Sequence, residues 1–113
     1  MTSRLAEDNF NKLLLEAIDE ALASLGGSVK QAIYFHLKDR FEIRKEEIPE
    51  RIGDFSEALE KIFGVGADFL EILIMKNLYE QIEQPLYWNK DKDLVFTDYI
   101  LAAKSRLVRG KRS

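Results

Sequence analysis

The sequence lacks most of the residues that carry chemistry in small proteins. Among 113 residues there is no cysteine and a single histidine, His36. Without cysteine the chain forms no disulfide, binds no metal through thiolates and has no thiol nucleophile. Only carboxylates remain to join the one histidine in a metal site. We therefore expect no catalytic residues, no metal ion and no other cofactor.

Long apolar runs are also missing. Short runs such as "ILIM", residues 72–75, fall far below the roughly 20 residues that a transmembrane helix needs. The start, "MTSRLAEDNF", has no apolar stretch of the kind that forms a signal peptide. These observations predict a cytoplasmic protein that makes no contact with a membrane.

Negative charge is absent from the end of the chain. The net charge is −3, but residues 99–113 contain five basic residues and no acidic ones, which leaves −8 for residues 1–98. A basic segment of this kind can contact the phosphates of a nucleic acid, or it can complement the dipole at the end of a helix. The five residues are Lys104, Arg106, Arg109, Lys111 and Arg112.

What the sequence does contain is apolar residues at helical spacing. From Phe10 to Leu25 they recur every three or four residues, which predicts an amphipathic helix that ends at Gly26-Gly27. A second helix is expected from Ser28 to about Phe41, with Val29 on its buried stripe. Ser28 and Gln31 have the spacing of a capping box, in which two side chains satisfy the first backbone N–H groups of a helix.

The second half of the chain continues the pattern. Residues 42–53 are expected to form a connector that Ile43, Ile48 and Ile52 anchor to the core, and in which Pro49 either breaks helix continuity or opens a new helix at its first turn. A helix follows, with Asp54 at its N-cap and Gly64 at its end. From Ala67 to Ile82 apolar residues cover almost the whole circumference, which is typical of a helix inside a bundle. A fifth helix is predicted for residues 97–108.

These elements predict an all-α protein, a four-helix bundle with an additional C-terminal helix. Residues 1–84 would form the bundle domain. Residues 85–113 would add a loop and a basic helix packed on the bundle, with "RGKRS" as a frayed tail.

The polar residues suggest little chemistry. His36 falls on the flank of the second helix's apolar stripe, where a lone histidine is usually a packing residue. Acidic pairs, as in "LAED" and "RKEEIPE", are expected to lie on solvated faces, and no carboxylate is expected to be desolvated. The alternating acids of "NKDKD" lack the glycine and the glutamate of a calcium loop.

Two stretches carry a resemblance to a known family. "SVKQAIYFHL" and "EALEKIFGVGA" belong to a segment, about residues 16–82, that resembles small archaeal all-helical domains classed as signal-output domains of archaeal two-component systems. The resemblance implies a compact helical bundle in a signalling role. No catalytic residues are carried over from this resemblance.

The function expected from these observations is a non-enzymatic protein-interaction or signal-output module. Its partner would be another protein or a second copy of the chain. Leu15, Phe35 and Trp88 are the predicted contacts, since each lies off its local apolar stripe. The alternative is a nucleic-acid-binding regulator that uses the basic residues of the C-terminal helix.

Overall fold

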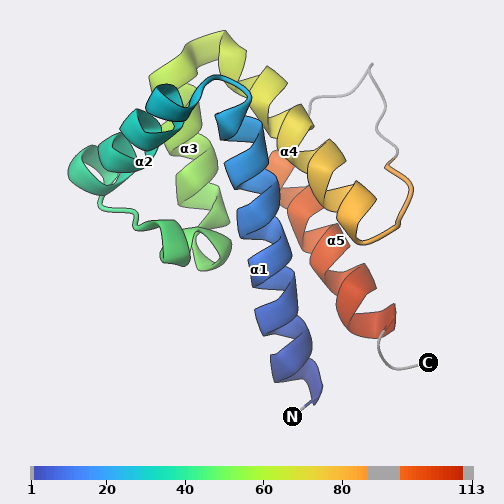
Figure 1. Ribbon diagram of the computed structural model, residues 1–113. Coiled ribbons are helices and arrows are strands. Elements are labelled where there is room, and N and C mark those ends of the chain that lie inside the picture. The colour runs from blue at the N-terminus through green and yellow to red at the C-terminus, as the bar shows by residue number, and fades with distance from the viewer. Residues whose placement is uncertain (1, 87–94, 111–113) are drawn as a thin grey trace.

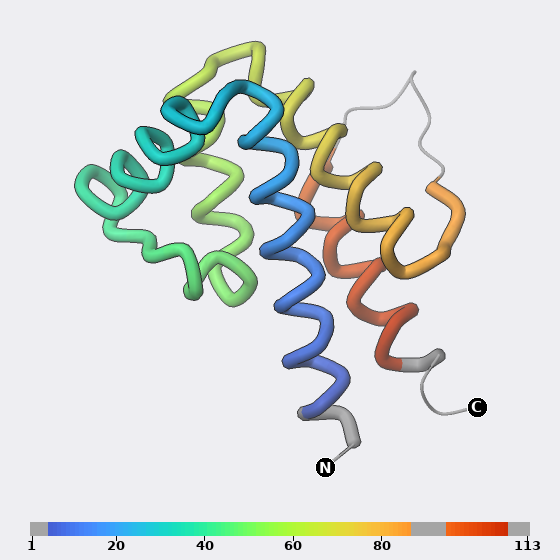
Figure 2. Tube along the Cα trace, in the orientation of Figure 1, coloured from blue at the N-terminus to red at the C-terminus, as the bar shows by residue number. Residues whose placement is uncertain are grey.

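The structure, a computed structural model, describes residues 2–86 and 95–110, with side-chain surroundings for residues 5–86 and 95–108. All regular elements in these ranges are helices, which confirms the predicted all-α bundle with an additional C-terminal helix (Figures 1 and 2). In chain order they are α1 (Thr2–Ala23), α2 (Gly27–Phe41), the 3₁₀ helix η1 (Lys45–Glu50), α3 (Ile52–Phe63), the 3₁₀ helix η2 (Gly64–Gly66), α4 (Ala67–Gln81) and α5 (Phe96–Gly110).

The centre of the molecule is the contact between α1 and α4, the most extensive of all the helix pairs in the described residues. Both helices bury a continuous apolar stripe, and Asn77 of α4 donates a hydrogen bond of 3.2 Å to the backbone oxygen of Ala17 in α1. Alanine at positions 17 and 21 of α1, both fully buried, allows the two helix backbones to approach closely. The buried residues of this contact include Leu14, Ile18, Leu22, Leu70, Ile74, Met75 and Leu78.

Helix α5 closes the bundle against α1, α3 and α4. It buries Phe96, Ile100 and Ala103, three positions on one face, and Phe96 packs against Phe55 of α3 with ring centroids 6.5 Å apart. The Tyr79 hydroxyl of α4 donates a hydrogen bond of 2.8 Å to the Tyr99 backbone oxygen. The helix extends to Gly110, two residues beyond the predicted end, and residues 111–113 lie outside the described residues.

Helix α2 lies at the periphery, where its main packing contacts among the described residues are with α1 and α3 (Figure 1, left). Ile33 and Leu37 are its two fully packed residues. The prediction that Val29 belongs to the buried stripe is wrong, because Val29 is 41% exposed. A helix on the outside of a bundle needs only a narrow apolar stripe, and α2 carries more apolar residues than that stripe contains.

The connector after α2 is more ordered than the sequence suggested. Glu42 adopts the left-handed conformation, with φ 55°, and the N–H of Ile43 donates to the Leu37 oxygen, which ends α2. The chain then forms η1, and Pro49 lies inside it instead of breaking it. Ile43 and Ile48 are buried and anchor the connector in the core, as predicted, while the third predicted anchor, Ile52, is partly buried against it.

Both predicted N-caps are wrong, although both glycine stops are confirmed. Helix α2 begins at Gly27, one residue before Ser28, and no side chain caps it. Helix α3 begins at Ile52, so that Asp54 lies in its first turn and pairs with Arg51 instead of capping the helix. Gly26 has φ 114° and Gly64 has φ 59°, backbone conformations that side chains with a Cβ rarely adopt.

Replacing Ile74 with Ala should lower the free energy of unfolding by about 2–5 kcal/mol, because the side chain is fully buried between helices. Urea denaturation of the purified variant measures this. The neighbouring Leu73→Ala variant is the matched control, since Leu73 is only half-buried and should cost less. Equal losses at the two positions would contradict the burial that the structure assigns to them.

Candidate protein-interaction surface

Three elements meet at the carboxylate of Asp19 on the side of α1. Lys30 of α2 donates to Asp19 Oδ2 at 3.1 Å, while the Tyr34 hydroxyl of α2 and Lys45 of η1 both donate to Oδ1, at 3.2 and 3.3 Å. The Lys45 ammonium also lies 5.0 Å from the centre of the Tyr34 ring. One carboxylate therefore holds α2 and η1 against α1.

The charges of this Asp19 cluster shift the acidity of its members. Burial alone would raise the pKa of Asp19, but the hydrogen bonds from Lys30 and Lys45 outweigh it and lower the pKa below its usual value. Burial and the adjacent Asp19 carboxylate raise the pKa of Tyr34, so that its hydroxyl stays protonated and remains a donor. The cluster is therefore an ionised, stable contact at neutral pH.

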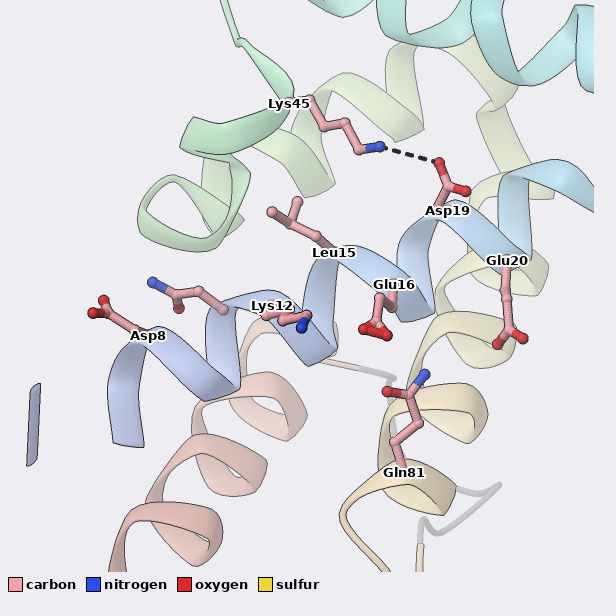
Figure 3. Close-up of a pocket in the computed structure, with 9 residues that line it drawn as sticks. Asp8, Lys12, Leu15, Glu16, Asp19, Glu20, Lys45 and Gln81 are labelled. Carbon is pink, nitrogen blue, oxygen red and sulfur yellow. Dashed lines mark hydrogen bonds and ion pairs between the residues drawn. The ribbon is translucent and has the colours of Figure 1, made fainter. Parts of the chain in front are cut away.

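A groove of about 650 Å³ runs along the outer face of α1 beside this cluster (Figure 3). We call it the acidic groove, because four of its six charged side chains are carboxylates. Half-buried Leu15 lies within it, with Lys45 of η1 on one side and Gln81 of α4 on the other. The charged residues that line it are Asp8, Lys12, Glu16, Asp19, Glu20 and Lys45.

A second groove, of about 550 Å³, lies between α2 and η1 and also includes Lys45. We call it the basic groove, because Lys38, Arg44 and Lys45 line it together with a single acid, Glu46. Phe35 lies at this groove with 67% of its surface exposed. An exposed phenylalanine among cations is a feature of contact surfaces rather than of solvated helix faces.

A third groove, the apolar groove, lies on the side of α2 that faces α3 and has a volume of about 430 Å³. It contains His36, whose ring packs in a tilted arrangement against Phe41 with centroids 6.1 Å apart. No carboxylate lines the groove, so His36 has neither a charge partner nor an orienting acid there. The other lining residues are Ser28, Val29, Ala32, Ile33, Ile62 and Phe63.

Further apolar side chains are exposed where the apolar groove ends. Phe63 is followed directly by η2, in which Val65 is 98% exposed, and Phe69 in the first turn of α4 is 66% exposed. The turns α1–α2 and α3–α4 lie at the same end of the molecule (Figure 1, top). Leu25, in the first of these turns, is also exposed. This end therefore presents apolar surface around the groove, which is typical of protein contact sites.

One functional candidate was missed in the sequence, the buried carboxyl of Glu71. It is 2% exposed at the contact of α4 with α3, where the Ser56 hydroxyl donates a hydrogen bond of 2.5 Å to Oε2. Burial, together with the nearby carboxylates of Asp68 and Glu60, raises the pKa of Glu71 although the Ser56 hydrogen bond opposes this. The expectation that no carboxylate is desolvated is therefore wrong. A single acid within the almost wholly apolar segment 69–75 was the available signal.

The predicted nucleic-acid contacts do not gather on one face where the structure describes them. Lys104 and Arg106 are two positions apart on α5, so that their side chains diverge by about 200°. Arg106 packs over the Tyr79 ring at 5.9 Å and donates to the Pro85 oxygen at 3.4 Å. Arg109 lies in α5 with its side chain outside the described set, and Lys111 and Arg112 fall outside the described residues.

The predicted protein contacts have three different outcomes. Phe35 is prominently exposed, and Leu15 is half-buried with its remaining surface in the acidic groove. Trp88 lies outside the described residues. The sequence did not show that Leu15 and Phe35 line neighbouring grooves.

The fold and these grooves define an all-helical bundle with open, shallow surface sites. Comparison with models of known protein families, with curated proteins and with solved structures finds no match. Within residues 2–86 and 95–110, no three His, Cys, Asp or Glu residues are grouped so that they could hold a metal ion. None of the helices described has both the length and the apolar character needed to cross a bilayer.

Replacing Glu71 with Gln should stabilise the protein at neutral pH. Because the folded-state pKa of Glu71 is raised above 4.5, the protonated carboxyl favours folding at low pH, and this stability is lost as the pH rises through the folded pKa. Gln cannot ionise, so the stability gained over wild type should grow between pH 4.5 and 7. Urea denaturation across this range measures it. Glu57→Gln, at an exposed site on α3, is the control, and a similar pH profile for both variants would contradict the burial of Glu71.

Replacing Asp19 with Asn should have the opposite pH dependence. The lowered folded-state pKa of Asp19 means that its ionised form stabilises the protein above the usual value of 3.8, and this contribution is lost as the pH falls through the folded pKa. Because the carboxylate is partly exposed, we expect a loss of only about 1 kcal/mol at pH 7. Thermal melts at pH 7 and pH 3 measure it. Glu7→Gln, at an exposed position of the same helix that lines none of the grooves, should be neutral. An Asp19→Asn effect that persists undiminished at pH 3 would exclude this account.

Proposed function

We propose that this protein is a non-enzymatic protein-interaction module of the signal-output type, and that the apolar groove is where its partner docks. The observation that carries the proposal is that groove, which opens to solvent beside the exposed Val29 and Ala32. In helix-in-groove recognition, an amphipathic helix of one protein places its apolar face in an open apolar groove of another, and this groove could serve as such a site. The archaeal signal-output resemblance of residues 16–82 supports the same role.

The way in which α2 is attached to the bundle suits a docking role. The buried side chains of Ile33 and Leu37 attach the helix to the core, and the Asp19 cluster attaches its side that faces η1. The opposite side, with Val29 and Ala32, is left free. A rigid receptor surface loses little conformational entropy when it binds, so a modest apolar contact can yield useful affinity.

The groove's lining supports binding more than catalysis. General acid–base work needs a second polar group aimed at the first, and His36 has Phe41 as its ring neighbour instead. The partner expected from this lining is an amphipathic segment that presents aliphatic or aromatic side chains, with its polar residues directed to solvent.

The alternative is a nucleic-acid-binding regulator that uses the C-terminal basic residues. A gel-shift titration at two salt concentrations, with and without residues 104–113, separates the two proposals. Binding that depends on this tail and falls steeply with salt would favour the alternative, because phosphate contacts release counterions.

Introducing charge into the apolar groove should abolish partner binding without unfolding the protein. A photo-crosslinking amino acid placed at Ala32 in cells of the native host should form a discrete adduct with one protein, and Val29→Glu should remove that adduct. Gln31→Glu is the matched control, since Gln31 is exposed on the same helix and does not line the groove. An adduct that survives Val29→Glu, or no adduct at all, would contradict docking at this groove.

A further inference from the structure

The acidic and basic grooves are adjacent, and Lys45 belongs to both. The acidic groove lies along α1, while the basic groove lies between α2 and η1. The side chain of Lys45, which pairs with Asp19 at 3.3 Å (Figure 3), lines both grooves. Two surfaces of opposite charge therefore lie side by side on one face of the molecule.

Other charges in the two grooves are not compensated within the described residues. Glu16 and Glu20 are exposed on α1, one helical turn apart, and neither forms an ion pair with a described residue. Like charges at this spacing destabilise a helix slightly unless cations approach them. Lys38 and Arg44 of the basic groove are likewise exposed and without an ion-pair partner among the described residues.

Each groove also contains an apolar side chain that could contact the apolar side chain of the other groove. Leu15 offers its uncovered surface inside the acidic groove, and Phe35 projects at the basic groove with 67% of its surface exposed. An exposed aromatic side chain and a half-buried aliphatic one would both remove apolar surface from water if they met. Burying an aromatic anchor within a ring of charged pairs is the usual composition of a contact centre.

We propose that two copies of this chain associate face to face, with the acidic groove of each copy covering the basic groove of the other. A twofold axis close to Lys45 would bring both pairs of grooves together at once, because that residue lines both grooves. A contact of this kind is isologous and closes as a dimer. Phe35 of one copy then reaches Leu15 of the other, and Glu16 and Glu20 face Lys38 and Arg44. The dimer surface is separate from the apolar groove, so it does not depend on the docking proposed above.

Sedimentation velocity of the full chain tests the association directly. The unmodified protein should dimerise with rising concentration at low salt, and the dissociation constant should increase as salt screens the facing charges. A monomer at every concentration in low salt would overturn the proposal.

Charge reversal on each groove then tests which surfaces meet. One variant carries Lys38→Glu and Arg44→Glu, and the other carries Glu16→Lys and Glu20→Lys. Each alone should weaken dimerisation by more than about tenfold, because like charges would face each other at both halves of the contact. Mixed in equal amounts, the two variants should form a heterodimer. In one half of that contact the two charge-reversed grooves face each other, and in the other half the two unchanged grooves do, so that opposite charges meet in both.

The mixture distinguishes this arrangement from other dimers. Failure of the mixture to associate, or full dimerisation of either variant alone, would overturn the proposed pairing of the grooves. Phe35→Ser provides a charge-neutral variant that should also weaken the dimer, and retention of wild-type affinity in it would contradict the proposed centre. A helical circular dichroism spectrum identical to that of the wild type confirms that the variants are folded. None of these outcomes changes if no partner docks at the apolar groove.

Discussion

The packing of α1 on α4 is the constraint on which the rest of the structure depends. Both helices bury apolar residues over most of their length, and the alanines at positions 17 and 21 bring their backbones together. The hydrogen bond from Asn77 to the Ala17 oxygen adds a directional polar contact to this apolar packing, which favours one register of the two helices. Helices α3 and α5 then cover the remaining apolar surface of α4, with Phe55 and Phe96 in contact between them.

Because α4 is already covered by α1, α3 and α5, helix α2 has no place in the central layer. It rests on α1 and α3 through Ile33 and Leu37, and the Asp19 cluster supplies a polar attachment instead of a deep apolar one. The apolar residues that α2 carries in excess of its narrow buried stripe are therefore left at the surface. Two of the three grooves described above lie along α2, and they follow from its peripheral position.

Much of the fold could be predicted from the sequence, because helical spacing of apolar residues is a local signal. The glycine stops at 26 and 64 were equally local, and both were confirmed. The predicted N-caps at Ser28 and Asp54 were wrong because the helices begin earlier, with their N-caps at Gly26 and Arg51, two and three residues upstream. The burial of Glu71 was missed because it depends on the approach of Ser56, fifteen residues earlier in the chain.

The candidate surface was less predictable than the fold. Leu15 and Phe35 were selected individually because they lie off their helical stripes. Their relation depends on η1, which carries Lys45 back to Asp19 and so places it in two grooves at once. The spacing of apolar residues within one helix does not show against which side of a neighbouring helix the following connector will pack. The apolar groove was not predicted for the same reason, since it joins residues 28–36 to residues 62–63.

The account requires that α2 be a surface element attached to a core that is complete without it. Hydrogen exchange of the free protein, followed amide by amide, tests this most directly. The account predicts that the central amides of α1 and α4 exchange only through global unfolding, while those of α2 exchange faster, through local opening. Protection of α2 equal to that of α4 would contradict it, because α2 would then belong to the cooperative core.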